Sequence, residues 1–123
     1  LLSLEGNDVA SGLKWMLYSN SVVLMPRPQF VTWAMEDQLV PWYHYIPLEA
    51  DLSDLSEKLQ WARDHDEDCW MIAQQATQYI DDLWMSDKAQ DETEKIVAGI
   101  VSRYQEQYGD VLHQCRKSGK AVE

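Results

Sequence analysis

Short apolar runs that alternate with helical spacing are the feature that most restricts the fold of this chain. Residues 1–4 and 21–25 are apolar runs typical of buried strands, and residues 42–48 form a third run, rich in aromatic side chains. Between them, residues 9–18 and 30–39 carry apolar side chains at helical spacing. A strand–helix–strand–helix–strand order predicts a parallel sheet with right-handed crossovers, and hence an α/β fold.

The second half of the chain is predicted to be helical. Asp54 and Glu57 have the spacing of a capping box, so we expect a helix to begin there. Apolar residues recur at helical spacing across 72–83 and 96–108, which indicates helices with one apolar face. Residues 114–123 are polar and are expected to form a frayed tail. The predicted architecture is a short parallel sheet followed by C-terminal helices.

The charge of the chain limits its partners. The net charge is −11 and the sequence pI is about 4.5, which disfavours nucleic acid and anionic membrane surfaces as partners. The bases of residues 1–50 are Lys14 and Arg27, whereas acids strongly outnumber bases between residues 51 and 95. We therefore expect an anionic ligand to bind the first third of the chain. The six Trp residues predict either a bulky core or surfaces that another part covers.

The turn after the first apolar run is the best candidate for a ligand site. Gly6 and Asn7 tolerate a positive φ, and Asp8 is a good N-cap, so a sharp turn is predicted to lead into a helix. Ligands of open α/β sheets bind at the carboxyl ends of the strands, where such a turn offers N–H groups to a phosphate. A tight turn with a helix cap explains the same residues equally well, and spacing alone does not separate the two.

The candidate ligand-binding residues extend beyond this turn. Ser11 adds a hydroxyl, Lys14 adds a positive charge, and Arg27 follows the second predicted strand. Asp8 would repel a phosphate unless its side chain faces a hydroxyl of the ligand. The full set of candidate binding residues is Gly6, Asn7, Asp8, Val9, Ala10, Ser11, Lys14 and Arg27.

Two other polar motifs favour structural roles over chemical ones. The acidic residues of 64–68 fit the first turn of a helix that begins near Asp66 better than they fit a metal site. His65 is then a surface residue. His44 is predicted to share one strand face with Trp42 and Ile46, where a hydrogen-bonded structural histidine is commoner than a catalytic one.

The remaining acids and cysteines add no metal or cofactor site. Glu36 and Asp37 are expected to be exposed to solvent at the end of the helix predicted for 30–39. Cys69 and Cys115 lack the spacing of metal ligands. No apolar run approaches the ~20 residues of a membrane span. The sequence thus predicts no metal, no cofactor and no membrane span.

Four stretches together resemble the C-terminal lobe of the CAP10-type glycosyltransferase domain, the family of the protein O-glucosyltransferases. They occur in order within residues 1–108 and read EGNDVASGLKW, NSVVLMP, LVPWYHYIPL and DLSDLSEKLQWARDHDEDCWMIAQQATQYI. The resemblance implies a GT-B architecture with two Rossmann-like lobes and a UDP-sugar in the cleft between them. It also implies inverting transfer of glucose or xylose to a hydroxyl group, without an obligatory metal.

The resemblance assigns roles to some of the candidate residues. Gly6 matches the family's turn glycine, Ser11 its small polar residue before the helix, and Lys14 its basic residue in the first turns. Many relatives place an arginine between that serine and that lysine, whereas this chain has Gly12 and Leu13 there. The phosphate role then falls on backbone amides and Lys14, with Arg27 as a second candidate.

The resemblance also implies what lies outside the chain. Residues 1–113 are expected to be the donor-binding lobe of a larger two-lobe enzyme, with 114–123 as a polar tail, because the first predicted strand begins at Leu1. The catalytic carboxylate of the family lies in its N-terminal lobe, so the expected partners are that lobe, a nucleotide sugar, and a protein or glycan acceptor. The implied compartment is the secretory pathway. Two alternatives stay open: a non-catalytic binding module, and another Rossmann-like nucleotide-binding enzyme.

Overall fold

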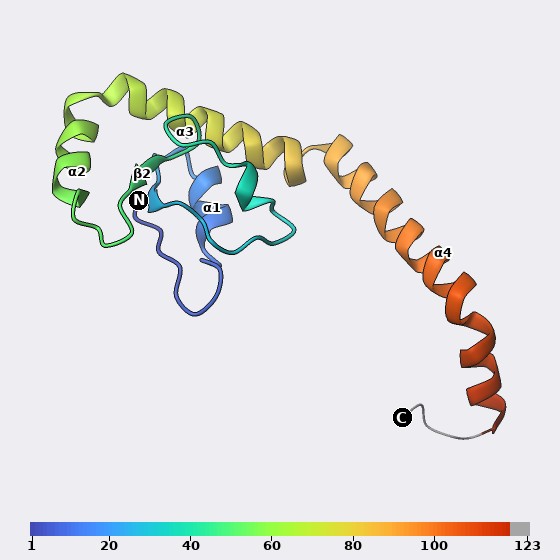
Figure 1. Ribbon diagram of the computed structural model, residues 1–123. Helices are drawn as coiled ribbons and strands as arrows, with labels where there is room; N and C mark the ends of the chain where they lie inside the picture. The colour runs from blue at the N-terminus through green and yellow to red at the C-terminus, as the bar shows by residue number, and fades with distance from the viewer. Residues whose placement is uncertain (119–123) are drawn as a thin grey trace. The chain divides into compact units, whose positions relative to one another are not determined.

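The computed structural model (Figure 1) describes the backbone of residues 1–118 and the side chains of residues 1–109. The chain forms two compact units, Leu1–Ser86 and Asp87–Glu123. The first unit holds the strands and all helices but the last. The division of the chain into a lobe at 1–113 and a tail at 114–123 stays a prediction.

A small parallel sheet lies at the centre of the first unit. Strands β1 (Leu24–Pro26) and β2 (Ile46–Leu48) pair in parallel, with Leu24 opposite Ile46. Residues 1–4 lie on the other side of β1, where Leu2 forms an isolated parallel bridge with Leu24. The parallel order of the three apolar runs is therefore confirmed. Within residues 1–118 the sheet has two strands, which does not establish a Rossmann-like lobe.

Helix α1 (Leu13–Tyr18) confirms the first predicted helix but begins later than expected. The prediction that Asp8 is its N-cap is wrong, because Gly12 precedes the helix and no side chain caps it. The Asp8 carboxylate instead accepts the N–H of the next residue, Val9, at 2.8 Å. A local bond of this kind competes with helix capping. With only six residues, α1 has a small dipole to offer a ligand.

The helix predicted for residues 30–39 is reduced to one 3-10 turn, η1 (Glu36–Gln38). Met35 interrupts the helix because its backbone is left-handed, with φ of 50°. The backbone N–H of Thr32 donates to the carboxylate of Glu36 at 2.7 Å, which holds the chain in a turn. A side-chain bond has thus replaced the helical ladder in this segment.

Of the strand predicted for residues 42–48, the structure forms only the last part, β2 (Ile46–Leu48). Trp42 has a positive φ of 62°, and the N–H groups of Tyr43 and His44 both donate to the carbonyl of Val40. This turn breaks the alternation of side chains, so His44, Tyr45 and Ile46 are all buried in succession. The predicted shared face of Trp42, His44 and Ile46 is therefore wrong.

The helices of the C-terminal half are confirmed. They are α2 (Leu55–Asp64), α3 (Asp66–Ile80), the π-helical turn η2 (Asp81–Met85) and α4 (Asp87–Ser118). Helix α3 begins at Asp66, as the acidic run predicted. A helix does begin after Asp54, but the prediction of a capping box there is wrong. The Asp54 carboxylate accepts the N–H of Glu49 at 2.9 Å and caps no helix N–H.

The two faces of the sheet carry separate hydrophobic clusters. Val23 and Met25 pack with α1 and the C-terminal part of α3, whereas Leu24, between them, packs with α2 and the N-terminal part of α3. Helix α3 contacts both clusters, and Figure 1 shows it running along the sheet and α1. The first cluster contains Leu13, Leu17, Val23, Met25, Leu39, Tyr45, Ala76 and Ile80; the second contains Leu24, Ile46, Leu48, Cys69 and Ile72.

The second unit consists, in its described residues, of the single helix α4. Its apolar residues Ile96, Ile100, Tyr104 and Tyr108 follow at steps of one helical turn, and all four are exposed. Residues 114–118 of the predicted tail belong to this helix, and residues 119–123 lie outside the described residues.

The core around α1 generates a stability prediction. Leu17 is 2% exposed, so Leu17→Ala leaves a cavity and should lower the free energy of unfolding by about 2–5 kcal/mol. Urea unfolding followed by Trp fluorescence measures the free energy of unfolding of the first unit, because all Trp residues lie in that unit. Leu59→Ala, at a position 40% exposed, is the control and should change it by less than about 0.5 kcal/mol. Equal losses in the two variants would contradict the described core.

Candidate functional site

A cavity of about 370 Å³ opens at the carboxyl ends of β1 and β2. Its walls come from the turn after residues 1–4, the segment after β1, and the segment after β2. We call it the strand-end cavity. This is the edge of a parallel sheet at which α/β proteins bind ligands. Its lining residues are Ser3, Leu4, Glu5, Gly6, Ala10, Leu13, Met25, Pro26, Arg27, Pro28, Gln29, Phe30, Ala50 and Leu52.

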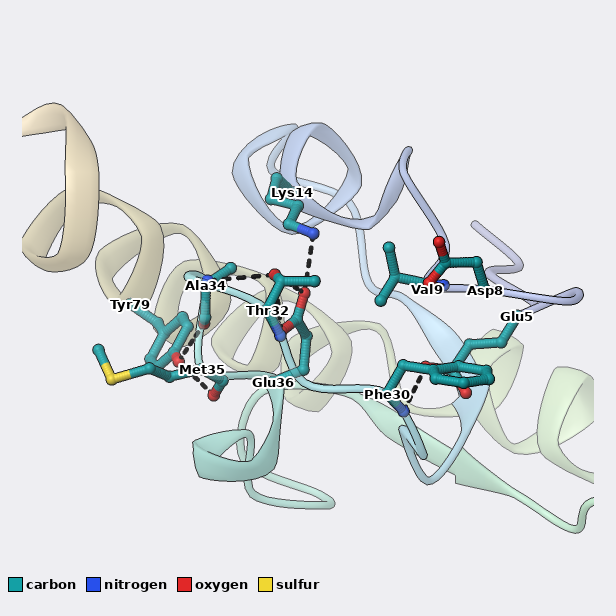
Figure 2. Close-up of polar contacts among 10 residues, drawn as sticks. All are labelled: Glu5, Asp8, Val9, Lys14, Phe30, Thr32, Ala34, Met35, Glu36 and Tyr79. Atoms are coloured by element: carbon teal, nitrogen blue, oxygen red, sulfur yellow. Dashed lines mark hydrogen bonds and ion pairs between the residues drawn. The ribbon is translucent and has the colours of Figure 1, made fainter. Parts of the chain in front are cut away.

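Glu5 joins two walls of the strand-end cavity. Its carboxylate accepts the backbone N–H of Gln29 at 3.0 Å and that of Phe30 at 3.3 Å. Figure 2 shows the contact with Phe30. The turn after the first segment is thereby tied to the loop after β1. No local sequence pattern indicates this role, because the two partners lie more than twenty residues away along the chain.

The structure divides the predicted binding residues between two cavities. Gly6, Ala10 and Arg27 line the strand-end cavity. Val9, Ser11 and Lys14 line a second cavity, next to α1. The exposed residues Asn7 and Asp8 line neither of these two. The binding roles of all eight residues stay predictions.

The expected backbone conformation of Gly6 is wrong. Gly6 does not adopt a positive φ, and a Cβ atom built on it would meet no other atom within 4 Å. The turn is therefore not strained at this position, and it has room for a Cβ atom.

Arg27 is the cation of the strand-end cavity. Its side chain is exposed at the carboxyl end of β1, and it forms no ion pair or hydrogen bond with the described residues. Burial raises the pKa of the Tyr45 hydroxyl in the core, and the positive charge of Arg27 partly offsets this rise. The guanidinium is thus free to bind an anion in the cavity.

Lys14, in contrast, already has a partner. Its Nζ lies 2.8 Å from Oε1 of Glu36, and the side chains of the two residues are 14% and 3% exposed. The Thr32 hydroxyl lies within 2.7 and 3.0 Å of the two Glu36 oxygens and donates to this carboxylate. Figure 2 shows Lys14 pointing from α1 to Glu36 and Thr32. The expectation that Glu36 is exposed is wrong.

The partners of Glu36 lower its pKa. Burial alone would raise the pKa of Glu36, but the Lys14 ammonium and the N–H and hydroxyl of Thr32 outweigh it and lower the pKa from 4.5 to about 2. Glu36 is therefore ionised at neutral pH, and its charge neutralises that of Lys14. A phosphate that recruited Lys14 would have to break this buried pair.

Two residues further along the chain complete the support of this region. The Tyr79 hydroxyl of α3 lies 2.8 Å from the carbonyl oxygen of Ala34 and 2.9 Å from that of Met35, and donates to them. His44 accepts the N–H of Val40 on Nδ1 at 2.9 Å, and burial lowers its pKa. Both residues hold the backbone, which agrees with the structural role predicted for His44.

The acidic run at 64–68 is part of the helical surface. His65 is exposed; its Nδ1 lies 2.8 Å from the carbonyl oxygen of Trp61, and its ring stacks on that indole at 4.5 Å. Among the described residues, no group of three or more His, Cys, Asp or Glu side chains could hold a metal ion. In the same part of the chain, no helix has the length and apolarity needed to cross a membrane.

The sequence of this chain also matches a family of enzymes. The family model of glycosyl transferase family 90 matches residues 1–104. The chain therefore belongs to glycosyl transferase family 90, which confirms the resemblance to the CAP10-type domain.

The relatives of this chain carry names that fit this family. The chain is 43% identical over 103 residues to an O-glucosyltransferase, LpsA, of Dichelobacter nodosus, an alignment that covers 84% of this chain and 31% of that protein. It is 38% identical over 86 residues to protein O-glucosyltransferase 2 of Danio rerio, covering 70% of this chain and 17% of that protein. The chain thus spans less than a third of the length of these relatives.

The lowered pKa of Glu36 predicts an acid-sensitive contribution to stability. Because the folded pKa lies below the ordinary value, this contribution is present above about pH 4.5 and is lost as the pH falls towards 2. It is on the order of 3 kcal/mol. Glu36→Gln should remove this part of the pH dependence in urea unfolding at several pH values. The exposed neighbour variant Asp37→Asn should retain it; a pH dependence unchanged in Glu36→Gln would refute the ion pair.

The bonds of Glu5 predict a local change at the strand-end cavity. Glu5→Ala removes the acceptor of the Gln29 and Phe30 amides, so both amide protons should exchange with solvent faster. Amide hydrogen exchange followed by NMR measures this. Glu49→Ala, at another exposed position, is the matched control and should leave both rates unchanged. Equal exchange rates in wild type and Glu5→Ala would show that the carboxylate does not hold the loop.

Proposed function

We propose that this chain binds a nucleotide-sugar donor, UDP-glucose or UDP-xylose, in the strand-end cavity, for inverting transfer to a hydroxyl of a protein or glycan acceptor. The observation that carries the proposal is the position of a free Arg27 and of Gly6 in a cavity at the carboxyl edge of a parallel sheet, in a chain of glycosyl transferase family 90. The names of the relatives support transfer of glucose to oxygen.

Arg27 is the proposed phosphate ligand. A guanidinium can bind two phosphate oxygens with parallel N–H bonds, which an ammonium cannot. Lys14 is the weaker candidate because Glu36 already neutralises its charge within a buried pair. Gly12 and Leu13 occupy the stretch in which many relatives have an arginine, and Leu13 gives the cavity an apolar wall. Backbone N–H groups near Gly6 would add the remaining contacts.

The cavity has the size of a small-molecule site but offers no evident general base. Its volume of about 370 Å³ lies within the range of ligand pockets. Glu5 is the carboxylate of its lining, and both oxygens already accept backbone N–H bonds. We therefore propose that the base which removes the acceptor's proton belongs to another lobe of the enzyme. The secretory pathway, implied by the resemblance, is the proposed compartment.

A second candidate function is a binding module without catalysis. The observation that favours it is the apolar Leu13 in the wall of the cavity, which leaves Arg27 as the cation of its lining. A lobe of this kind could hold its fold while binding the donor only weakly.

Titration of the chain with UDP tests the proposal. The amide signals of Gly6, Arg27 and Ala50 should shift in NMR spectra, because these residues line the cavity. Arg27→Ala should weaken binding on the order of tenfold or more, since it removes a charge-assisted contact. The loss should shrink as salt rises.

The matched control is Arg63→Ala, an exposed arginine in the last turn of α2, which should bind UDP as the wild type does. Equal affinity of Arg27→Ala and wild type, or shifts confined to residues 64–68, would contradict the donor site. A complete lack of UDP binding would favour the module without catalysis.

A further inference from the structure

The second cavity, of about 630 Å³, has aromatic walls. Trp15 and Tyr18 of α1, Trp33 of the loop after β1, and Trp84 of η2 contribute to its lining. We call it the indole cavity. Its three indoles are 58%, 59% and 47% exposed, in the order in which they occur. Large aromatic surfaces left open together usually mark a binding site.

The walls of the indole cavity are held in place. The rings of Trp33 and Trp84 pack edge to face, with centroids 4.8 Å apart. The ammonium of Lys14 also lies over the ring of Trp33, 5.7 Å from its centroid. Lys14 is itself fixed by Glu36. A site whose walls are already positioned loses less entropy when a ligand binds.

The charges at the indole cavity cancel. Lys14 is the charged residue of its lining, and its ion pair with the ionised Glu36 leaves no net charge there. An anionic ligand would find no free cation, and the acidic chain as a whole would repel it. The cavity therefore suits a neutral ligand.

The polar groups of the indole cavity point to a ligand with hydroxyls. Ser11 Oγ and the indole N–H groups of Trp15 and Trp33 form no hydrogen bond with the described residues. A purely apolar ligand that covered these groups would leave them unpaired, which is unfavourable. A pyranose ring satisfies both demands, because its hydroxyls pair with such groups while its C–H faces stack on the electron-rich faces of indoles.

We propose that the indole cavity is a binding site for a neutral saccharide, separate from the strand-end cavity. Only the role of that saccharide, as acceptor or product glycan, rests on the proposed function. The binding itself requires neither UDP nor Arg27.

Titration of the nucleotide-free chain with cellobiose and with methyl β-glucoside tests this site. The indole N–H signals of Trp15, Trp33 and Trp84 should shift in NMR spectra. Trp33→Ala should weaken binding on the order of tenfold, because it removes a stacking face. Ser11→Ala should weaken it less, because one hydrogen bond is lost.

Two control variants distinguish the indole cavity from exposed indoles elsewhere and from the strand-end cavity. Trp70→Ala removes a Trp on α3 that is 63% exposed and outside the cavity, and should not change the affinity. Arg27→Ala should also bind the saccharides normally, so a failed donor site leaves this result intact. Circular dichroism spectra matching the wild type would show that Trp33→Ala is folded.

Three results would overturn the proposal. The first is the absence of saccharide-dependent shifts at any of the three indoles, well above millimolar concentration. The second is unchanged affinity in both Trp33→Ala and Ser11→Ala. The third is binding of the apolar dye anilinonaphthalene sulfonate at these indoles without binding of either saccharide, which would indicate an apolar partner instead.

Discussion

The ion pair between Lys14 and Glu36 is the contact that ties the loop after β1 to α1 and sets the charge of the indole cavity. It joins α1 to the loop after β1 across 2.8 Å with little access to water. Removing one partner of such a pair strands the other charge, whereas replacing both by apolar side chains is often neutral or stabilising. The pair therefore holds the loop in place while both charges are present, and loss of either partner is expected to destabilise the fold. The paired Lys14 ammonium lies over Trp33 in the wall of the indole cavity, and its charge is already neutralised, whereas Arg27 in the strand-end cavity has no such partner among the described residues.

Strand β1 connects this arrangement to the rest of the unit. Its two faces supply both hydrophobic clusters, and its carboxyl end supplies the rim of the strand-end cavity. A central parallel strand accepts neighbours on both sides, so the ligand edge is set by the same residues that build the core. Binding residues on such an edge are positioned by rigid elements, while the loop around them can vary between relatives.

The sequence predicted those features that depend on local patterns. The parallel order of the apolar runs, the helix ending at Tyr18 and the start of α3 at Asp66 each follow from spacing or from helix-terminal charges. Residues 30–42 were predicted wrongly because side-chain bonds replace the helical ladder there, both within the segment, from Thr32 to Glu36, and from far along the chain, as Tyr79 reaches the carbonyl of Ala34 across 45 residues. For the same reason the burial of Glu36 was not predictable. Of the candidate site, Gly6, Ala10 and Arg27 share one cavity as expected from the strand ends, whereas the pairing of Lys14 could not be read from its position.

The anchoring of the loop after β1 by Tyr79 has a consequence for how the chain is made. A ribosome releases the N-terminal residues first, at about 5–20 residues per second. The sheet strands and α1 emerge well before α3, so the carbonyl groups of Ala34 and Met35 lack the bonds from the Tyr79 hydroxyl until that residue leaves the exit tunnel. Trp84, which completes the indole cavity, follows a few residues later. During this interval Trp15 and Trp33 lack the ring of Trp84 that later packs on Trp33 in the same cavity.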